Sequence, residues 1–326
     1  MKEKNNSVVK QASTVLNNLG IWAILVLLFV FLSITTGNSF LTSSNLINLV
    51  RQICVTGVCA IGATVVVCGG EMDLSSGSIA ALMGCASAML TVNYGWPTWV
   101  ALLVAILGGA VIGSFSGCVI TFLKVPAFIA TLGMMYVLDG FTLLMTRGTP
   151  ITNLPSDYKF IGRGYLGPIP FIVVILMVLV AVFAFIFKYT QFGRNIVTVG
   201  ENATSARLSG INVVGIKISA YACAGALSAL SGIMLMARLG SGQPTAASDL
   251  CLTAMAAVFV GGTSAINTQG AALKTLAGAL FIGMINNGLN LLEVNAYWQK
   301  IVLGFIIIFA IALDVYRTAQ ASRQAS

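Results

Sequence analysis

Residues 188 to 217 read KYTQFGRNIVTVGENATSARLSGINVVGIK, a polar stretch inside a chain that is otherwise almost entirely apolar. Its basic residues are Lys188, Arg194, Arg207 and Lys217, and its single carboxylate is Glu201. Long apolar runs flank the stretch on both sides. The pattern therefore predicts a polar loop, residues 189–216, between two membrane spans.

The composition excludes a water-soluble fold. Apolar residues make up 58% of the 326 residues and charged residues only 8%. Uncharged runs of about 18 residues or more can cross a hydrocarbon core roughly 30 Å thick as helices. Lipid offers no partners to the backbone, so the spans must satisfy their own hydrogen bonds. The alternating period of a membrane β-barrel is absent. We predict an all-α integral membrane protein.

Ten apolar runs qualify as spans, which places both termini on the same side of the membrane. They cover about 20–36, 47–69, 76–92, 98–122, 127–146, 167–188, 217–237, 250–264, 270–290 and 299–315. The two short runs, 76–92 and 250–264, leave eight as the fallback count. Residues 19–316 are expected to form one transmembrane domain, with cytoplasmic tails at 1–18 and 317–326.

The basic residues support an orientation with both termini in the cytoplasm. Eleven fall on the inner side of the ten-span arrangement: Lys2, Lys4, Lys10, Lys124, Lys188, Arg194, Arg207, Lys217, Lys274, Arg317 and Arg323. Six fall outside or at the outer ends: Arg51, Arg147, Lys159, Arg163, Arg238 and Lys300. Such an excess of inner basic residues is the usual bias of membrane proteins. It predicts a multi-pass membrane protein in contact with lipid. The net charge of +8 is not clustered, which argues against a nucleic-acid partner.

A weak repeat relates the two halves of the chain. Asp73-Leu74 precedes Ile79-Ala80-Ala81-Leu82, and Asp249-Leu250 precedes Met255-Ala256-Ala257-Val258 at the same spacing. In the ten-span arrangement the first copy lies at a cytoplasmic turn and the second at a periplasmic turn. Repeats of opposite orientation are typical of transporters.

Enzymatic chemistry has no candidates. The chain contains no histidine, and its seven cysteines lie in apolar segments without a CxxC pair, so we expect neither a metal site nor a catalytic residue. The nearest approach to a phosphate loop, Gly210 to Gly215, has its lysine out of register at Lys217. If ATP drives this protein, a separate chain hydrolyses it. No cofactor is expected here, and ATP and Mg²⁺ would bind that partner.

The carboxylates leave two functional classes open. Glu71, Asp73, Asp139, Asp249, Glu293 and Asp314 are placed near the ends of the spans. Asp73 and Asp249 can also act as N-caps of the helices that follow. An ion-gradient-driven carrier of a small polar solute needs titrating groups deep in its spans. That class remains the alternative, and it predicts loss of transport when Asp73 or Asp249 is neutralised.

Polar residues inside the apolar pattern mark a candidate path. The segment Gly69–Ser78 breaks the pattern abruptly, and irregular backbone at membrane depth requires surrounding protein or water. Amides within an apolar helix either join helices or hydrogen-bond a polar solute, and both readings stay open. The candidate path or gate residues are Asp73, Ser75, Ser76, Ser78, Gln243, Asp249, Asn286, Asn287 and Asn290.

A short helix is expected at the centre of the polar loop. Gly200 precedes it, it runs from Glu201 to Leu208, and Ser209-Gly210 ends it. Its small side chains form a low surface that suits the groove of another protein. The residues concerned are Glu201, Asn202, Ala203, Thr204, Ser205, Ala206, Arg207, Leu208, Ser209 and Gly210.

Six stretches resemble the permease subunits of bacterial ATP-binding-cassette importers, in the ribose and allose branch of the monosaccharide family. They are GGEMDLSSGSIAAL, VPAFIATLGMM, GENATSARLSGINVVGIK, SGQPTAASDL, AAVFVGGTSA and NNGLNLL, in order between Asn45 and about Asp314. The chain departs from the pattern at Glu71, where an uncharged residue is common.

The resemblance implies a permease that imports ribose or a related pentose or hexose. It implies about ten helices per subunit and a dimeric pore, which we expect to be a homodimer. A periplasmic sugar-binding protein would dock outside and a separate ATPase inside. Residues 200–210 would then correspond to the coupling helix that inserts into the ATPase.

Overall fold

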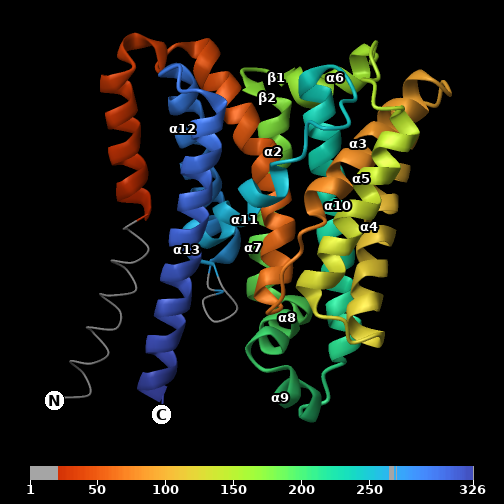
Figure 1. Cartoon of the computed structure of the whole chain (residues 1–326), viewed down its shortest axis with the longest axis vertical. Helices are drawn as coiled ribbons and strands as arrows, with labels where there is room; N and C mark the ends of the chain where they lie inside the picture. Colours follow the sequence, from red (N-terminus) through yellow and green to blue (C-terminus); the bar gives the residue numbers. More distant parts are fainter. Residues whose placement is uncertain (1–20, 264–267, 269, 326) are drawn as a thin grey trace.

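A computed structural model describes residues 21–263, 268 and 270–325 of the chain. Over these residues the protein is almost entirely helical (Figure 1). A helix at Ile21–Thr35 and a short helix η1 (Gly37–Ser39) come first. The remaining elements are α2 (Ser43–Cys68), α3 (Ser76–Val92), α4 (Thr98–Phe122), α5 (Ala127–Thr146), α6 (Ser156–Arg163), β1 (Tyr165–Leu166), β2 (Ile169–Pro170), α7 (Phe171–Tyr189), α8 (Gln191–Glu201), α9 (Ala203–Leu208), α10 (Val213–Leu239), α11 (Leu250–Val260), α12 (Ala271–Leu291) and α13 (Ala296–Ala325).

Each of the ten predicted spans coincides with one of these helices. Five helices of the described part, α2, α4, α5, α7 and α10, are long and apolar enough to cross a membrane. The helices Ile21–Thr35, α3, α11 and residues 296–312 of α13 are apolar but shorter. The all-α membrane fold is confirmed, whereas the number of crossings stays a prediction.

The polar elements gather at the two ends of the helical bundle. Figure 1 shows α8 and α9 at one end, together with the end of α13, and α6 with the β1–β2 hairpin at the other. We call these the α9 end and the α6 end. The short helix α6 is anchored by Tyr158, whose fully buried hydroxyl lies 2.6 Å from the Ser87 hydroxyl of α3. Helix α6 was not predicted, because it lies between the predicted spans 127–146 and 167–188.

Helices α4 and α10 pack closely against each other. A Cβ added to Gly113 would lie 2.0 Å from the Tyr221 carbonyl oxygen, and one added to Gly225 would lie 2.1 Å from the Gly109 carbonyl oxygen. Because neither glycine has a side chain, the two backbones touch and gain dispersion contacts that lipid cannot replace. The glycine spacing of α4 therefore serves helix packing, as expected.

The helix contacts repeat between the two halves of the chain. Helix α3 packs on α4 and α5, and α11 packs on α12 and α13. Likewise α4 packs against α10, and α12 against α2, while α2 and α10 pack against each other. Exchanging α2–α5 for α10–α13 thus maps these contacts onto one another, which fits a repeat, whereas the opposite orientation of its two copies stays a prediction.

Two details differ from the sequence analysis. Asp139 lies in the C-terminal half of α5, within the helix and not at its end, and its side chain is exposed. Helix α13 continues to Ala325, past residue 316, where the last span was expected to stop. The predicted N-terminal tail, residues 1–18, lies outside the described residues, as does Ser264 of the stretch AAVFVGGTSA.

Candidate coupling segment and translocation path

The polar loop between α7 and α10 folds into two helices, where we expected one. Helix α8 begins after Thr190, whose hydroxyl oxygen accepts a hydrogen bond from the Gly193 amide at 3.1 Å. It continues through Gly200 to Glu201. The expected start of the short helix at Glu201 was therefore wrong, because Gly200 and Glu201 complete α8. Helix α8 has an apolar stripe, Ile196 and Val199, that is buried against the bundle.

Helix α9 spans Ala203–Leu208 and has well-defined caps. The Asn202 side chain accepts a hydrogen bond from the Ser205 amide at 2.9 Å, which is the usual N-cap geometry. At the other end Gly210 has φ of +81°, and the Ile211 amide donates to the Ala206 carbonyl at 3.0 Å. This left-handed glycine ends the helix as predicted. The caps give a six-residue helix a fixed shape.

Most of α9 faces away from the bundle. Ala206 is buried against Val199 and Val213, and this contact holds the helix on α8 and α10. The outward positions are Glu201, Asn202, Thr204, Ser205, Arg207, Leu208, Ser209 and Gly210, while Ala203 is half-buried. Leu208 is 85% exposed. An apolar tip beside a cation, beyond the last turn of the spans, is a surface suited to a protein partner.

Asp73 is buried in the break between α2 and α3, residues 69–75, and its side chain accepts hydrogen bonds from the same segment. One carboxylate oxygen accepts hydrogen bonds from the Ser75 amide at 2.8 Å and the Ser75 hydroxyl at 2.6 Å. The residue preceding α3 is Ser75, so the expected N-cap role of Asp73 was wrong. Asp73 is only 2% exposed, so the protein encloses it.

The break between α2 and α3 meets the start of α11 and the loop before it inside the bundle. A Cβ on Gly77 would lie 3.0 Å from the Ala247 carbonyl oxygen, and the Cys251 thiol lies 3.6 Å from the Asp73 carbonyl oxygen. Asp249 itself points outward, and its exposed carboxylate lies 3.3 Å from the Lys300 ammonium. It occupies the position before α11 but makes no side-chain cap. The junction therefore unites Asp73, but not Asp249, with the opposite half.

Several hydroxyl groups surround this junction. Ser75, Ser76 and Ser78 are all buried. In the described part of the chain, the hydroxyls of Ser76 and of Ser228 on α10 are fully covered and have no hydrogen-bond partner. Buried polar groups normally find partners, so these two hydroxyls, together with the Nε atom of Arg51, are the exceptions among the described side chains.

The remaining path candidates do not converge on this junction. Gln243 is half-buried in the loop after α10, and its amide donates to the Ser241 hydroxyl at 3.1 Å. Asn287 exchanges two amide hydrogen bonds, of 3.0 and 2.8 Å, with Asn45 of α2. Asn290 accepts a hydrogen bond from Gln299 of α13 at 2.9 Å, and Asn286 is half-buried. Asn287 and Asn290 therefore join helices, which was one of the two readings.

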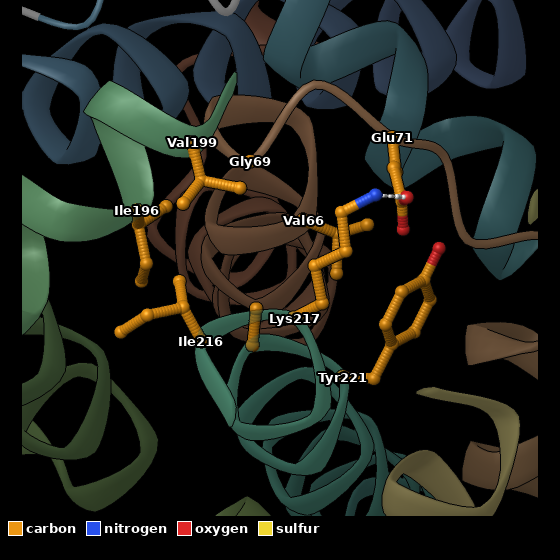
Figure 2. Close-up of a pocket in the computed structure, with 9 residues that line it drawn as sticks. Val66, Gly69, Glu71, Ile196, Val199, Ile216, Lys217 and Tyr221 are labelled. Atoms are coloured by element: carbon orange, nitrogen blue, oxygen red, sulfur yellow. Dashed lines mark hydrogen bonds and ion pairs between the residues drawn. The ribbon is translucent and has the colours of Figure 1, made fainter. Parts of the chain in front are cut away.

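A small pocket at the α9 end contains an ion pair that sequence reasoning missed. It is lined by Val66, Gly69, Glu71, Ile196, Val199, Ile216, Lys217, Ala220 and Tyr221 (Figure 2). Lys217 at the start of α10 forms an ion pair with Glu71 of the break. The available signal was the departure at Glu71 from the family pattern, but no sequence rule pairs it with a lysine 146 positions away.

The comparisons with known proteins agree with this architecture. A family model described as the branched-chain amino acid transport system / permease component matches residues 45–311. The ribose import permease protein RbsC of Haemophilus influenzae is 41% identical over 85% of this chain and 87% of its own length. RbsC of Bacillus subtilis is 42% identical, over 94% and 95%, and the probable ABC transporter permease protein YphD of Escherichia coli is 36% identical, over 98% and 96%.

No solved structure gives a significant match to the chain. The matches do not support the ion-gradient-driven carrier that the sequence analysis left open. They describe a transport subunit of a bacterial inner membrane and not an enzyme. Because the family model and these relatives each cover most of the chain, the protein belongs to the family of membrane permease subunits of ATP-binding-cassette importers.

Proposed function

We propose that this permease imports a monosaccharide, ribose or a related pentose or hexose, and that α9 is the element on which its ATPase acts. A periplasmic binding protein delivers the sugar at the α6 end, and a separate ATPase binds ATP and Mg²⁺ at the α9 end. The observation that carries the proposal is the capped helix α9, whose exposed Arg207 and Leu208 stand clear of the bundle.

The uncharged polar groups of the interior suit a sugar. Ser76 and Ser228 offer hydroxyls without internal partners, and Asn286 adds an amide. Hydroxyls and amides hydrogen-bond a polyol without holding it strongly, so release stays fast. Ser78 is proposed to line the path beside Ser76, whereas Gln243, which is half-buried, and Asp249, which is exposed, are proposed to act nearer its end.

A second permease subunit, in our proposal an identical one, covers α5. Asp139 is exposed on α5 within an apolar helix, between Tyr136 and Leu143, which are exposed as well. A carboxylate at membrane depth is costly against hydrocarbon and usually faces protein or a water-filled cavity. Its exposure in the single chain therefore supports a partner subunit or a shared path on this face.

The role of α9 is tested with Arg207→Glu and Leu208→Asp in the permease reconstituted with its ATPase and binding protein. Both side chains are exposed, so the bundle should fold normally. We expect ATP hydrolysis to continue while sugar uptake falls at least tenfold. An ATPase that no longer binds α9 cannot drive the conformational change of the permease. Lys188→Glu, an exposed charge change on α7 at the same end, is the control. Normal uptake in both α9 variants would refute the role of α9.

The sugar is tested separately. Each candidate sugar, bound to the binding protein encoded beside this permease, is added to the reconstituted complex, and the stimulation of ATP hydrolysis is measured. We expect one pentose or hexose to stimulate strongly. Stimulation by an amino acid and by no sugar would overturn the proposed substrate class.

A further inference from the structure

The break between α2 and α3 is tied to α10 by two side chains. Lys217 pairs with Glu71, and the two side chains are only 23% and 14% exposed (Figure 2). One turn further along α10, the Tyr221 hydroxyl donates to the Met72 carbonyl oxygen at 3.3 Å. Successive residues of the break are thus held by successive turns of one helix.

The same break is pressed against the end of α8. A Cβ added to Gly200 would lie 2.0 Å from the Cys68 carbonyl oxygen, and one added to Gly70 would lie 3.0 Å from the Gly200 carbonyl oxygen. No side chain separates the two backbones here. Gly200 precedes the first residue of α9, Ala203, by only three positions. A displacement of α9 toward the bundle therefore reaches the break directly.

The two connections transmit different forces. A contact between backbones resists compression but not separation, because it rests on repulsion and dispersion. A partly buried ion pair with hydrogen-bonding geometry resists separation as well, since parting the charges leaves each of them poorly solvated. Together they let the break follow α9 and the start of α10 in both directions.

The break also holds the junction of the two halves. It carries Asp73 and Ser75, and the first turn of α3 behind it touches Ala247 and Cys251 of the second half. Moving residues 69–75 therefore shifts the contact between the two repeats, next to the unpartnered hydroxyls of Ser76 and Ser228.

We propose that Glu71 and Lys217 are positioning residues that make residues 69–75 move together with the coupling helix α9. The inference rests on the proposed role of α9, and it adds the route by which a movement of that helix reaches the interior. Neither residue touches the ATPase or the sugar in this scheme. Their effect is on coupling alone.

The test uses the complete complex of permease, ATPase and binding protein in lipid nanodiscs. Lys217→Met removes the charge and keeps most of the volume, and the double variant Glu71→Gln/Lys217→Met removes the lone charge that the single change leaves. We expect the stimulation of ATP hydrolysis by sugar-loaded binding protein to fall about fivefold or more in both, a usual size for coupling between sites. Lys217→Arg and the exchange Glu71→Lys/Lys217→Glu should restore it.

Lys188→Met is the matched control, because this exposed lysine lies at the same end and stacks on Tyr189 without an ion pair in the described structure. It should leave the stimulation unchanged. Loss of stimulation in Lys188→Met equal to that in Lys217→Met would overturn the inference, as would normal stimulation in the double variant. The inference would also be overturned if the exchange variant Glu71→Lys/Lys217→Glu had wild-type thermal stability but did not regain the stimulation of ATP hydrolysis.

Hydrogen exchange gives a readout that a merely structural role would not move. In the wild-type complex, nucleotide should change the exchange of residues 69–78 and of residues 200–210. In Lys217→Met residues 200–210 should respond in full, whereas the response of residues 69–78 should be clearly reduced, because only the backbone contact with Gly200 remains. An unaltered response of residues 69–78 in Lys217→Met would overturn the inference and leave the role of α9 intact. If residues 200–210 of the wild type do not respond at all, both proposals fall together.

Discussion

Asp73 and Asp249 hold matching places in the two halves of the chain but lie in opposite surroundings. Asp73 is enclosed and accepts two hydrogen bonds from Ser75, whereas Asp249 is exposed beside Lys300. The enclosed carboxylate has a local structural task, and the exposed one takes part in an ion pair of the kind that contributes about 0–1 kcal/mol. Only the first should matter for the interior of the bundle.

Replacing Asp73 by asparagine should therefore be far milder than replacing it by alanine. The asparagine oxygen can still accept from Ser75, so we expect Asp73→Asn to retain most of the sugar uptake. Asp73→Ala leaves a buried amide and hydroxyl without an acceptor, at about 1–3 kcal/mol each. Uptake and thermal stability in detergent are the measurements, with Asp249→Asn as the control. Complete loss of uptake in a stable Asp73→Asn would revive a titrating role.

At the scale of elements, the contact between α4 and α10 depends on missing side chains. Gly113→Leu places a Cβ within 2.0 Å of the Tyr221 backbone oxygen, so the two helices must separate. We expect the free energy of unfolding to fall by about 3 kcal/mol or more, and the melting temperature in detergent to be clearly lower. Gly304→Leu on α13, where nothing lies within 4 Å, is the matched control and should be tolerated. Equal loss in both would show that the contact between α4 and α10 does not explain the cost, since leucine favours a helix more than glycine at either position.

The elements could be predicted to different degrees, for physical reasons. The helices at the ten predicted spans follow from long runs with few charges, because lipid allows few alternatives to a helix. Helix α8 was missed since its buried stripe, Ile196 and Val199, is spread through a polar stretch. Asp73 was assigned as a cap from spacing alone, although a short carboxylate can instead accept from the residue two places on. The pair Glu71–Lys217 depends on how α2 meets α10, which no local pattern encodes.

At the scale of the whole molecule, the exposed face of α5 indicates what the single chain lacks. Cysteines at Tyr136 of α5 and at Phe185 of α7 compare two outward positions, which are 70% and 58% exposed. If α5 and the second subunit enclose a water-filled path beside Asp139, Tyr136→Cys in the assembled transporter should react with a water-soluble maleimide faster than Phe185→Cys. The parent for both is a chain with its seven native cysteines replaced. Equal, slow labelling would show that water does not reach this face of α5.

The amide pair between Asn45 and Asn287 has a consequence for biosynthesis. The two residues are separated by 242 positions, so α2 enters the membrane long before its partner is made. At about 5–20 residues per second, translation leaves roughly 10–50 s in between. During that interval Asn45 has only the Phe40 carbonyl, at 2.9 Å, among its final partners. Closing the pair requires that α12 has been inserted beside α2, so it is among the last steps by which a newly made chain becomes a finished bundle.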